Sequence, residues 1–330
     1  MTKTALTLML SMALAFSGCV SPGPTSWAVK KLIESVPLAT PPVDFAQIQD
    51  GVEVLPNLSY PSQYQNNVYD VYLPSQVSPG ARLPVVIWVH GGAFVAGDKA
   101  DVRYFAPALA HQGYMVVAMN YQLAPAAVYP TPLIQIQELY RALLTVAPEH
   151  QGDMSQLFFA GDSAGAQMVA QFLAIQTNPD LATAMSMPAV VPKKHLKGAL
   201  LYCGPYDLSA LKGGTDSTMV NFVLNQLGWS YLGDKDWLHS DAVRQADVVS
   251  HMTPDFPPAY VTDGNTFSFE AHGQALVKVL QQHKVPVHSR FFDKADGVTE
   301  HEYQFKMDSE AGQLAFADSL RFLKQYRGPQ

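Results

Sequence analysis

A short apolar segment that runs into a serine between small residues constrains this chain more than any other feature. Residues 157–160 are apolar and lead directly into residues 161–165, which read GDSAG. This segment fits the G-x-S-x-G nucleophile elbow, in which a strand turns sharply into a helix and holds the serine hydroxyl above the sheet. Apolar residues then recur at helical spacing from Met168 to Ile175. Ser163 is therefore a candidate nucleophile, and an ordinary glycine-serine turn is the alternative, because motifs this short also occur by chance.

Strand-like and helical segments alternate along the chain on both sides of this turn. The strand-like runs are residues 68–73, 83–89, 114–119, 157–159, 198–203, 259–262 and 287–292. Most of them are apolar without alternation, as expected of strands that are covered on both faces. We therefore expect an α/β fold with a mostly parallel, doubly wound sheet, helices on both faces, and functional residues at the carboxyl ends of the strands.

A glycine-rich segment, HGGAF at residues 90–94, follows one of these predicted strands. Acyl transfer needs backbone amides placed where the carbonyl oxygen becomes negative, and glycine lets such amides approach closely. We expect Gly91 and Gly92 to supply two of these donors. The amide of Ala164, at the start of the helix after Ser163, is expected to supply a third, aided by the helix dipole. A purely structural glycine turn is the alternative interpretation of HGGAF.

Three segments together resemble the hormone-sensitive-lipase-like branch of the α/β-hydrolase superfamily, near small bacterial esterases: HGGAF at 90–94, YQLAP at 121–125 and GDSAG at 161–165. The resemblance extends over roughly residues 68–323. It implies the α/β-hydrolase fold, hydrolysis of short, uncharged carboxylic esters through an acyl-enzyme, and no cofactor. The family usually has arginine where this chain has Gln122, a difference that we expect to leave the chemistry unchanged.

A nucleophilic serine needs a base, and in this architecture the order along the chain is serine, acid, histidine. His301 follows the last predicted strand and precedes the final predicted helix, which matches the position of the family's histidine. We expect it to take the serine proton and return it to the leaving alcohol. An uninvolved loop histidine is the alternative. The other late histidines are assigned to surface or packing roles: His251, His272, His283 and His288.

The acid of the predicted triad is the point at which this chain departs from the family. Where the family places an aspartate, this chain has Phe267, which cannot orient an imidazole. The nearby carboxylates are Asp263, at the end of the strand, and Glu270, one helical turn beyond the usual site. Glu270 is slightly preferred, and Asp207 is a more distant third candidate. Asp263 followed by Gly264 is also a good turn pair, and Glu270 would also suit a helix N-terminus through its charge alone.

The first residues are expected to direct export rather than to belong to the fold. Residues 1–18 combine Lys3 with an apolar run at 5–16 and small residues after it. This pattern predicts a secretory signal peptide, and the run is too short to span a membrane.

The end of this segment resembles the lipobox of bacterial lipoproteins. Residues 16–19 read FSGC, with Phe16 where leucine is usual. The resemblance implies that Cys19 carries a lipid anchor on an exported protein of the bacterial cell envelope. Val20 in place of aspartate favours the outer membrane by family analogy. A protein secreted without a lipid is the alternative.

The rest of the chain divides into an arm and a catalytic domain. Residues 19–61 contain the lipid attachment site and proline- and glycine-rich stretches, and are expected to form a tether and an irregular arm. Residues 62–330 are expected to form one α/β-hydrolase domain. Within it, residues from about 208 to 254 carry a weaker sheet signature and several large aromatic side chains. We expect a small cap that presents an apolar wall to the substrate, although core packing is the commoner role of such residues.

Charge and cysteine content exclude several classes of partner. The formal net charge is -7 and no lysine- or arginine-rich block is present, so a nucleic acid partner is not expected. The chain has two cysteines, Cys19 and Cys203, and a lipid on the first would leave none to pair with the second. No clustered spacing of histidine, cysteine and aspartate predicts a metal.

These observations predict a serine carboxylesterase of the cell envelope, with a small-molecule ester as its substrate. A peptidase or arylamidase on the same scaffold would use the same residues. A non-catalytic binding lipoprotein that retained the fold is a further alternative, suggested by the displaced aspartate. The serine, histidine and glycine motifs are intact, which argues against loss of the site.

Overall fold

The computed structural model of the chain describes residues 21–36, 39–211 and 217–328. The expected signal peptide at residues 1–18 and the expected lipid attachment site at Cys19 lie outside these ranges, and both stay predictions. Within the described ranges, every helix is too short or too polar to cross a membrane.

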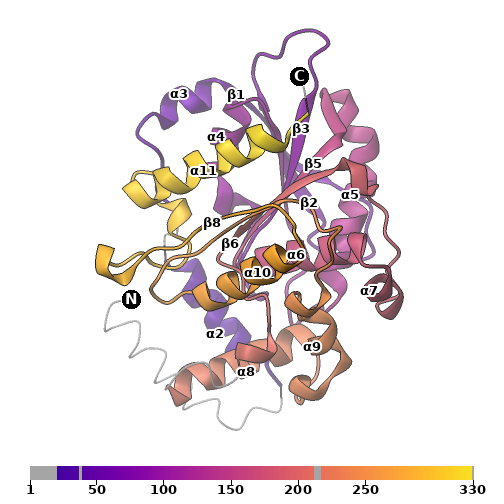
Figure 1. Ribbon diagram of the computed structural model, residues 1–330, viewed down its shortest axis with the longest axis vertical. Helices are drawn as coiled ribbons and strands as arrows, with labels where there is room; N and C mark the ends of the chain where they lie inside the picture. Colours follow the sequence, from indigo (N-terminus) through magenta and orange to yellow (C-terminus); the bar gives the residue numbers. More distant parts are fainter. Residues whose placement is uncertain (1–20, 37–38, 212–216, 329–330) are drawn as a thin grey trace.

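A single sheet of eight strands runs through the molecule in the order β1-β2-β4-β3-β5-β6-β7-β8 (Figure 1). The strands are β1 Val52–Ser59, β2 Val68–Pro74, β3 Leu83–Val89, β4 Met115–Met119, β5 Gly152–Asp162, β6 Leu196–Tyr202, β7 Ala259–Thr262 and β8 Val287–Arg290. The β1–β2 and β2–β4 pairs are antiparallel, and all the remaining pairs are parallel. The predicted mostly parallel sheet is confirmed.

Helices cover both faces of this sheet. They are α2 Gly23–Glu34, α3 Phe45–Asp50, α4 Phe105–His111, α5 Thr131–Glu149, α6 Ala164–Thr177, α7 Pro179–Ala184, α8 Thr218–Leu232, α9 Asp241–Ala246, α10 Glu270–Gln282 and α11 Glu310–Tyr326. One apolar core lies between the sheet and helices α5, α6 and α10, and a second lies between the opposite face and helices α4 and α11. Figure 1 shows α4 and α11 on one side of the sheet and α5 on the other.

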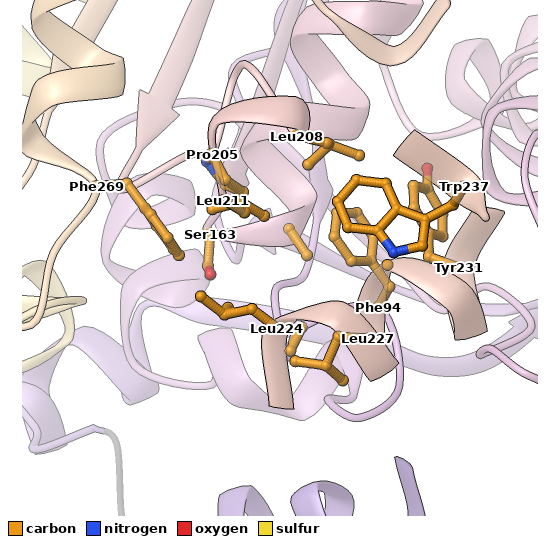
Figure 2. Close-up of a pocket in the computed structure, with 13 residues that line it drawn as sticks. Phe94, Ser163, Pro205, Leu208, Leu211, Leu224, Leu227, Tyr231, Trp237 and Phe269 are labelled. Carbon is orange, nitrogen blue, oxygen red and sulfur yellow. The ribbon is translucent and has the colours of Figure 1, made fainter. Parts of the chain in front are cut away.

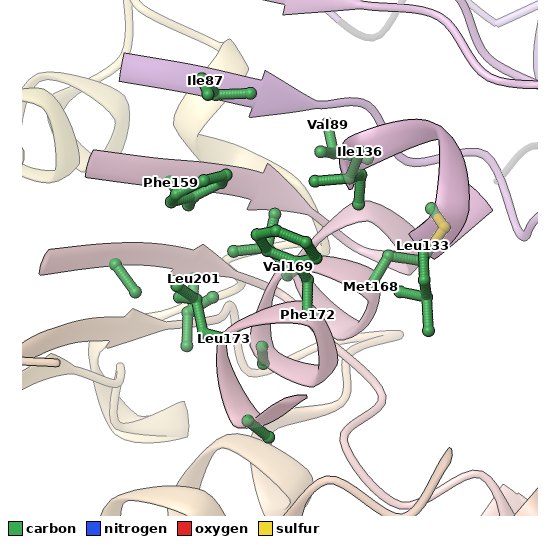
Figure 3. Packing of buried hydrophobic residues seen from close by; sticks show 14 of the residues in the cluster. Ile87, Val89, Leu133, Ile136, Phe159, Met168, Val169, Phe172, Leu173 and Leu201 are labelled. Carbon is green, nitrogen blue, oxygen red and sulfur yellow. The ribbon is translucent and has the colours of Figure 1, made fainter. Parts of the chain in front are cut away.

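Strand β3 shows why its sequence is apolar at every position. Val85, Ile87 and Val89 belong to the core under α5 and α6, whereas Val86 and Trp88 belong to the opposite core. Successive side chains of a strand point to opposite faces, so a strand covered on both sides needs apolar residues throughout. In Figure 3, Ile87 and Val89 face the α6 side chains together with strand residues Phe159 and Leu201.

The arm expected to be irregular is largely regular. Helices α2 and α3 form in it, and β1 adds an edge strand to the sheet, so the folded domain begins before residue 62. Pro22 and Pro24 lie before and within the first turn of α2, where a missing amide hydrogen costs nothing because that turn has no intrahelical acceptor. Pro56 lies on an edge strand, where its pairing register shifts. Proline marks the starts and edges of these elements rather than disorder.

The expected cap at residues 208–254 contains α8 and α9, and it is joined by a helix from the arm. Helix α2 packs along α8 at one end of the molecule (Figure 1). The buried hydroxyls of Ser26 and Ser230 form a hydrogen bond between the two helices. Ile33 of α2 and Leu227 of α8 both pack against an apolar cluster that contains Val95. The cap is therefore built from two segments of the chain that lie far apart in sequence.

Candidate active site

Ser163 lies at the sharp turn between β5 and α6, as the GDSAG motif predicts. Its backbone has φ 50° and ψ -117°, a conformation that non-glycine residues rarely adopt. A Cβ atom on Gly165 would lie 2.0 Å from the carbonyl oxygen of Val89, so only glycine lets α6 approach the end of β3 here. A Cβ atom on Gly161 would lie 2.5 Å from the backbone of Gly165. The two glycines fix the turn that presents the Ser163 hydroxyl.

His301 lies against this hydroxyl although the two residues are far apart in sequence. Its Nε2 atom is 3.1 Å from Oγ of Ser163. The backbone amide of His301 donates a hydrogen bond to the carbonyl oxygen of Thr266, and the Phe269 ring lies edge-on to the imidazole at a centroid distance of 5.3 Å. These contacts hold the imidazole where it could accept the serine proton.

Asp263 is the carboxylate that faces the other nitrogen of the ring. Its Oδ1 atom lies 3.4 Å from Nδ1 of His301, which is within ion-pair distance but too long for a hydrogen bond, and Nδ1 has no hydrogen-bond partner among the described residues. Asp263 is buried, and its two oxygens accept hydrogen bonds of 2.7 Å from the amides of Gly264 and Phe269. The carboxylate is therefore fixed by the backbone at the end of β7.

The preference for Glu270 is wrong in this geometry. Glu270 begins α10 and accepts a hydrogen bond of 2.9 Å from Gln274 one turn later, so it acts at the helix start as its alternative interpretation suggested. Asp207 accepts hydrogen bonds from the amide and hydroxyl of Ser209. Phe267, at the family's aspartate position, is 75% exposed. The family's aspartate position, counted along the chain, falls in the loop after β7. The carboxylate that faces His301 instead belongs to Asp263, directly at the end of β7.

The charges around His301 change its affinity for protons. Burial lowers the pKa of the imidazole, whereas the nearby carboxylates of Asp263, Glu302 and Asp162 raise it. The effect of the carboxylates is the larger one, so the pKa of His301 lies above its ordinary value. A base with such a pKa binds the serine proton more strongly than a free imidazole does.

The backbone amides near Ser163 differ from the expected set of donors. The amide of Gly91 already donates a hydrogen bond of 2.8 Å to Oδ2 of Asp162, so its assignment as an oxyanion donor is corrected. Among the described residues, no acceptor binds the amides of Gly92 and Ala93, which line the cleft beside Ser163. The amide of Ala164, in the first turn of α6, has no intrahelical acceptor.

Ala93 is therefore a candidate donor that sequence reasoning missed. It has a positive φ of 53° and lines both of the cavities that meet at Ser163. The sequence signal that points to it is Asp162, the residue before Ser163. A buried carboxylate needs hydrogen-bond donors, and Asp162 takes the amide of Gly91, so the oxyanion donors move one residue along the HGGAF segment to Gly92 and Ala93.

A second buried carboxyl group, that of Glu302, lies close to Asp162. A Cβ atom built on Gly91 would lie 2.5 Å from Oδ2 of Asp162 and 3.0 Å from Oε1 of Glu302, so both carboxyls pack against the same glycine. Asp162 also accepts a hydrogen bond of 2.7 Å from the indole of Trp88. Burial raises the pKa of both groups. The charge of Glu302 raises the pKa of Asp162 further, whereas a side-chain hydrogen bond with Asp162 opposes the rise in the pKa of Glu302. No motif in the sequence indicates a role for Glu302.

Two cavities meet at Ser163. The smaller one, of about 60 Å³, lies under the cap and has apolar walls (Figure 2). Its walls include Phe94, Leu224, Leu227, Tyr231, Trp237 and Phe269. The larger one is an open cleft of about 640 Å³. It is lined by Leu32, Ile33 and Val36 from the arm and by Phe267, Glu300, His301 and Glu302. The aromatic wall expected of the cap is present in the smaller cavity.

One group of potential metal ligands surrounds Nδ1 of His301. Single ligand atoms of Cys203, Asp263 and His301 lie within 4.8 Å of one another. The donor set suits a cation poorly, because burial raises the pKa of the Cys203 thiol well above its ordinary value and Asp263 already accepts two amide hydrogen bonds. The thiol sulfur instead accepts a hydrogen bond of 3.4 Å from the amide of Glu302. We assign Cys203 to the support of the loop that carries His301.

The sheet order, the serine at the strand-to-helix turn and the histidine against it define an α/β hydrolase. The crystal structure of esterase B from Lactobacillus rhamnosis has the same fold, with a TM-score of 0.75 at 23% identity over 97% of this chain and 95% of that chain. The chain belongs to the BD-FAE family, whose sequence pattern matches residues 69–275, more than half of its 330 residues. The narrower hormone-sensitive-lipase-like assignment stays a prediction.

Relatives with names that indicate an activity match part of the chain. Kynurenine formamidase from Salmo salar is 31% identical over 156 residues, which are 47% of this chain and 47% of that protein. Esterase LipQ from Mycobacterium tuberculosis is 23% identical over 201 residues, 61% of this chain and 46% of that protein. The chain thus spans about half the length of the curated relatives it matches.

Proposed function

We propose that this protein is a serine carboxylesterase that hydrolyses esters of short carboxylic acids. The observation that carries the proposal is the 3.1 Å distance between Oγ of Ser163 and Nε2 of His301, at the point where two cavities meet. The similarity to proteins named as esterases supports the same reaction.

In the proposed acylation, Ser163 Oγ attacks the ester carbonyl carbon while its proton passes to Nε2 of His301. The electron pair of the carbonyl moves onto its oxygen, which the amides of Gly92, Ala93 and Ala164 would stabilise. When the tetrahedral intermediate collapses, the bond to the alcohol oxygen breaks and the imidazolium protonates that oxygen. Asp263 keeps the ring in the tautomer that makes this transfer possible.

In the proposed deacylation, a water molecule takes the place of the alcohol. His301 removes its proton, the hydroxide attacks the acyl-enzyme, and Ser163 leaves with the proton returned by the imidazolium. The products are a carboxylic acid and a regenerated serine, so the cycle consumes only the ester and water.

Hydrolysis of p-nitrophenyl acetate and butyrate by the purified protein tests this proposal. We expect turnover by the wild-type protein and a loss of at least about a thousandfold in kcat for Ser163→Ala, because that variant lacks the nucleophile. A Ser155→Ala variant, changed at an exposed position whose hydroxyl binds Asp153, is the matched control and should retain its rate. Equal rates for wild type and Ser163→Ala would contradict the proposal.

Hydrolysis of a small amide is the second candidate function. The similarity to kynurenine formamidase over about half of this chain favours it, and a cavity of about 60 Å³ has room for a formyl group. Amides differ from esters in the need to protonate an amine before it leaves, which the same histidine would do. A comparison of kcat/KM for formanilide and phenyl formate distinguishes the two: a higher value for the ester supports the esterase, and a higher value for the amide supports the amidase.

We also propose that the full chain is exported and lipid-anchored through Cys19, on the basis of the signal pattern at residues 1–19. Metabolic labelling with an alkyne fatty acid should mark the wild-type protein and leave Cys19→Ser unmarked. Equal labelling of the two proteins, or none of either, would contradict the anchor without affecting the proposed reaction.

A further inference from the structure

The position of His301 assigns a role to each of the two cavities, and this assignment rests on the proposed esterase reaction. Nε2 of His301 hands its proton to the leaving oxygen, so the alcohol part of the ester lies on the same side of Ser163 as the imidazole. His301 lines the larger cleft, of about 640 Å³, and the described walls of the smaller cavity do not include it. The cleft therefore receives the alcohol, and the smaller cavity, of about 60 Å³, receives the acyl chain.

The carboxyl groups that line this cleft are engaged within the protein. Glu302 shares a hydrogen bond with the side chain of Asp162. Glu300 forms an ion pair of 2.6 Å with Lys306, and Asp101 accepts a hydrogen bond of 2.8 Å from a backbone amide. Because these groups already have partners, we look to the apolar side chains of the cleft for selection among alcohols.

Two strongly exposed apolar side chains line the same cleft. Phe267 is 75% exposed and Val36 is 50% exposed. Leu32 and Ile33, one turn before Val36 on α2, extend this apolar surface. Apolar surface that is exposed in a cleft leaves water when an apolar group covers it, and this transfer is favourable.

The backbone on both sides of Phe267 is tied to residues of the proposed catalytic site. The carbonyl oxygen of Thr266 accepts a hydrogen bond of 3.1 Å from the amide of His301. The amide of Phe269 donates a hydrogen bond of 2.7 Å to Asp263. Phe267 itself has φ 49°, a conformation that bulky residues rarely adopt and that persists where neighbouring contacts impose it. The position of the ring in the cleft is thus coupled to that of the imidazole.

We propose that Phe267 determines specificity for the alcohol, and that the protein favours esters of bulky apolar alcohols, aromatic ones above all. An aromatic ring on the alcohol would pack against the Phe267 ring, a contact that contributes more than burial of the same area alone. The aliphatic side chains of α2 and Val36 would cover more of its surface. A small alcohol such as ethanol is too short to make these contacts.

Benzyl acetate and ethyl acetate test this inference, because they form the same acetyl-enzyme and differ only in the alcohol. Each value of kcat/KM is divided by the rate constant for alkaline hydrolysis of the same ester, which removes the difference in leaving-group reactivity. We expect the corrected ratio of benzyl to ethyl acetate to be roughly tenfold or more in the wild-type protein. In Phe267→Ala this ratio should fall by roughly threefold or more, whereas Phe267→Tyr, which keeps the ring, should retain it.

Val298→Ala is the matched control, since it shortens an apolar side chain that is also 75% exposed and that lies outside the described walls of both cavities. Its ratio should equal that of the wild-type protein. A corrected wild-type ratio near one, or a ratio no lower in Phe267→Ala than in Val298→Ala, would overturn the inference. Absence of turnover of both esters by the wild-type protein would instead contradict the esterase itself, so the two failures are distinguishable.

Discussion

The amide of Gly91 donates a hydrogen bond of 2.8 Å to the carboxylate of Asp162, the residue immediately before Ser163. This bond ties the segment after β3 to the turn after β5, which are neighbouring parallel strands. The first glycine of HGGAF therefore supports the turn that carries the nucleophile, and the next two amides remain available to a substrate.

Asp162→Asn should destabilise the protein. Both carboxylate oxygens accept N–H groups, from Trp88 and Gly91, and an asparagine would turn its own N–H₂ group toward one of these donors. Leaving a buried donor unpaired costs about 1–3 kcal/mol, which urea unfolding would detect. Asp255→Asn, which removes an exposed partner of Lys193, should change the free energy of unfolding by less than about 1 kcal/mol. Equal effects of the two variants would contradict this assignment.

Asp263→Asn should lower kcat by at least about a hundredfold, because asparagine cannot hold His301 in the required tautomer. Glu270→Gln should stay within about twofold of the wild-type rate, since its carboxylate binds Gln274 at the helix surface. Initial rates with p-nitrophenyl acetate measure both. A greater loss in Glu270→Gln than in Asp263→Asn would restore the preference that the sequence suggested.

The pH dependence of kcat/KM should show an acidic limb that reflects His301. The imidazole must be neutral to accept the serine proton, so activity is lost as pH falls through its pKa. The surrounding carboxylates outweigh burial and raise that pKa above the ordinary value of 6.5 for histidine, so the midpoint of the limb should lie above 6.5. Measured profiles with p-nitrophenyl acetate should show this midpoint, and a midpoint clearly below 6.5 would contradict the charge arrangement.

The smaller cavity should limit the length of the acyl chain. Leu224→Ala removes a branched side chain from its wall and should raise the ratio of kcat/KM for p-nitrophenyl octanoate to that for the acetate. Leu144→Ala, at a position 49% exposed on α5, should leave the ratio unchanged. An octanoate ratio that does not move in Leu224→Ala would show that the acyl chain lies elsewhere.

The parts of the fold predicted from the sequence are those that local patterns determine. Strand β3 was predicted over its full length because both of its faces are buried, and the turn at Ser163 because its glycines are required by close backbone contacts. Helix α2 was missed because its prolines suggested irregular chain. What stabilises that helix is its packing against α8, a contact that local sequence does not reveal.

The site was predictable to the same extent. Ser163 and His301 were named because a motif and a position after the last strand identify them. Choosing Asp263 over Glu270 required knowledge of which carboxylate the backbone fixes near the ring, and that depends on the path of the loop after β7. Glu302 follows His301 directly, yet its burial in the cleft wall comes from contacts with distant segments.

Labelling with a fluorophosphonate probe, followed by peptide mass spectrometry, tests the central claim most directly. The probe reacts with a serine whose proton is removed by a base, so it reports the pairing of Ser163 with His301 rather than any particular substrate. We predict one label per molecule, located on Ser163, absent in Ser163→Ala and much slower to form in His301→Ala. A folded wild-type protein that takes up no label, or takes it up at another residue, would contradict the account.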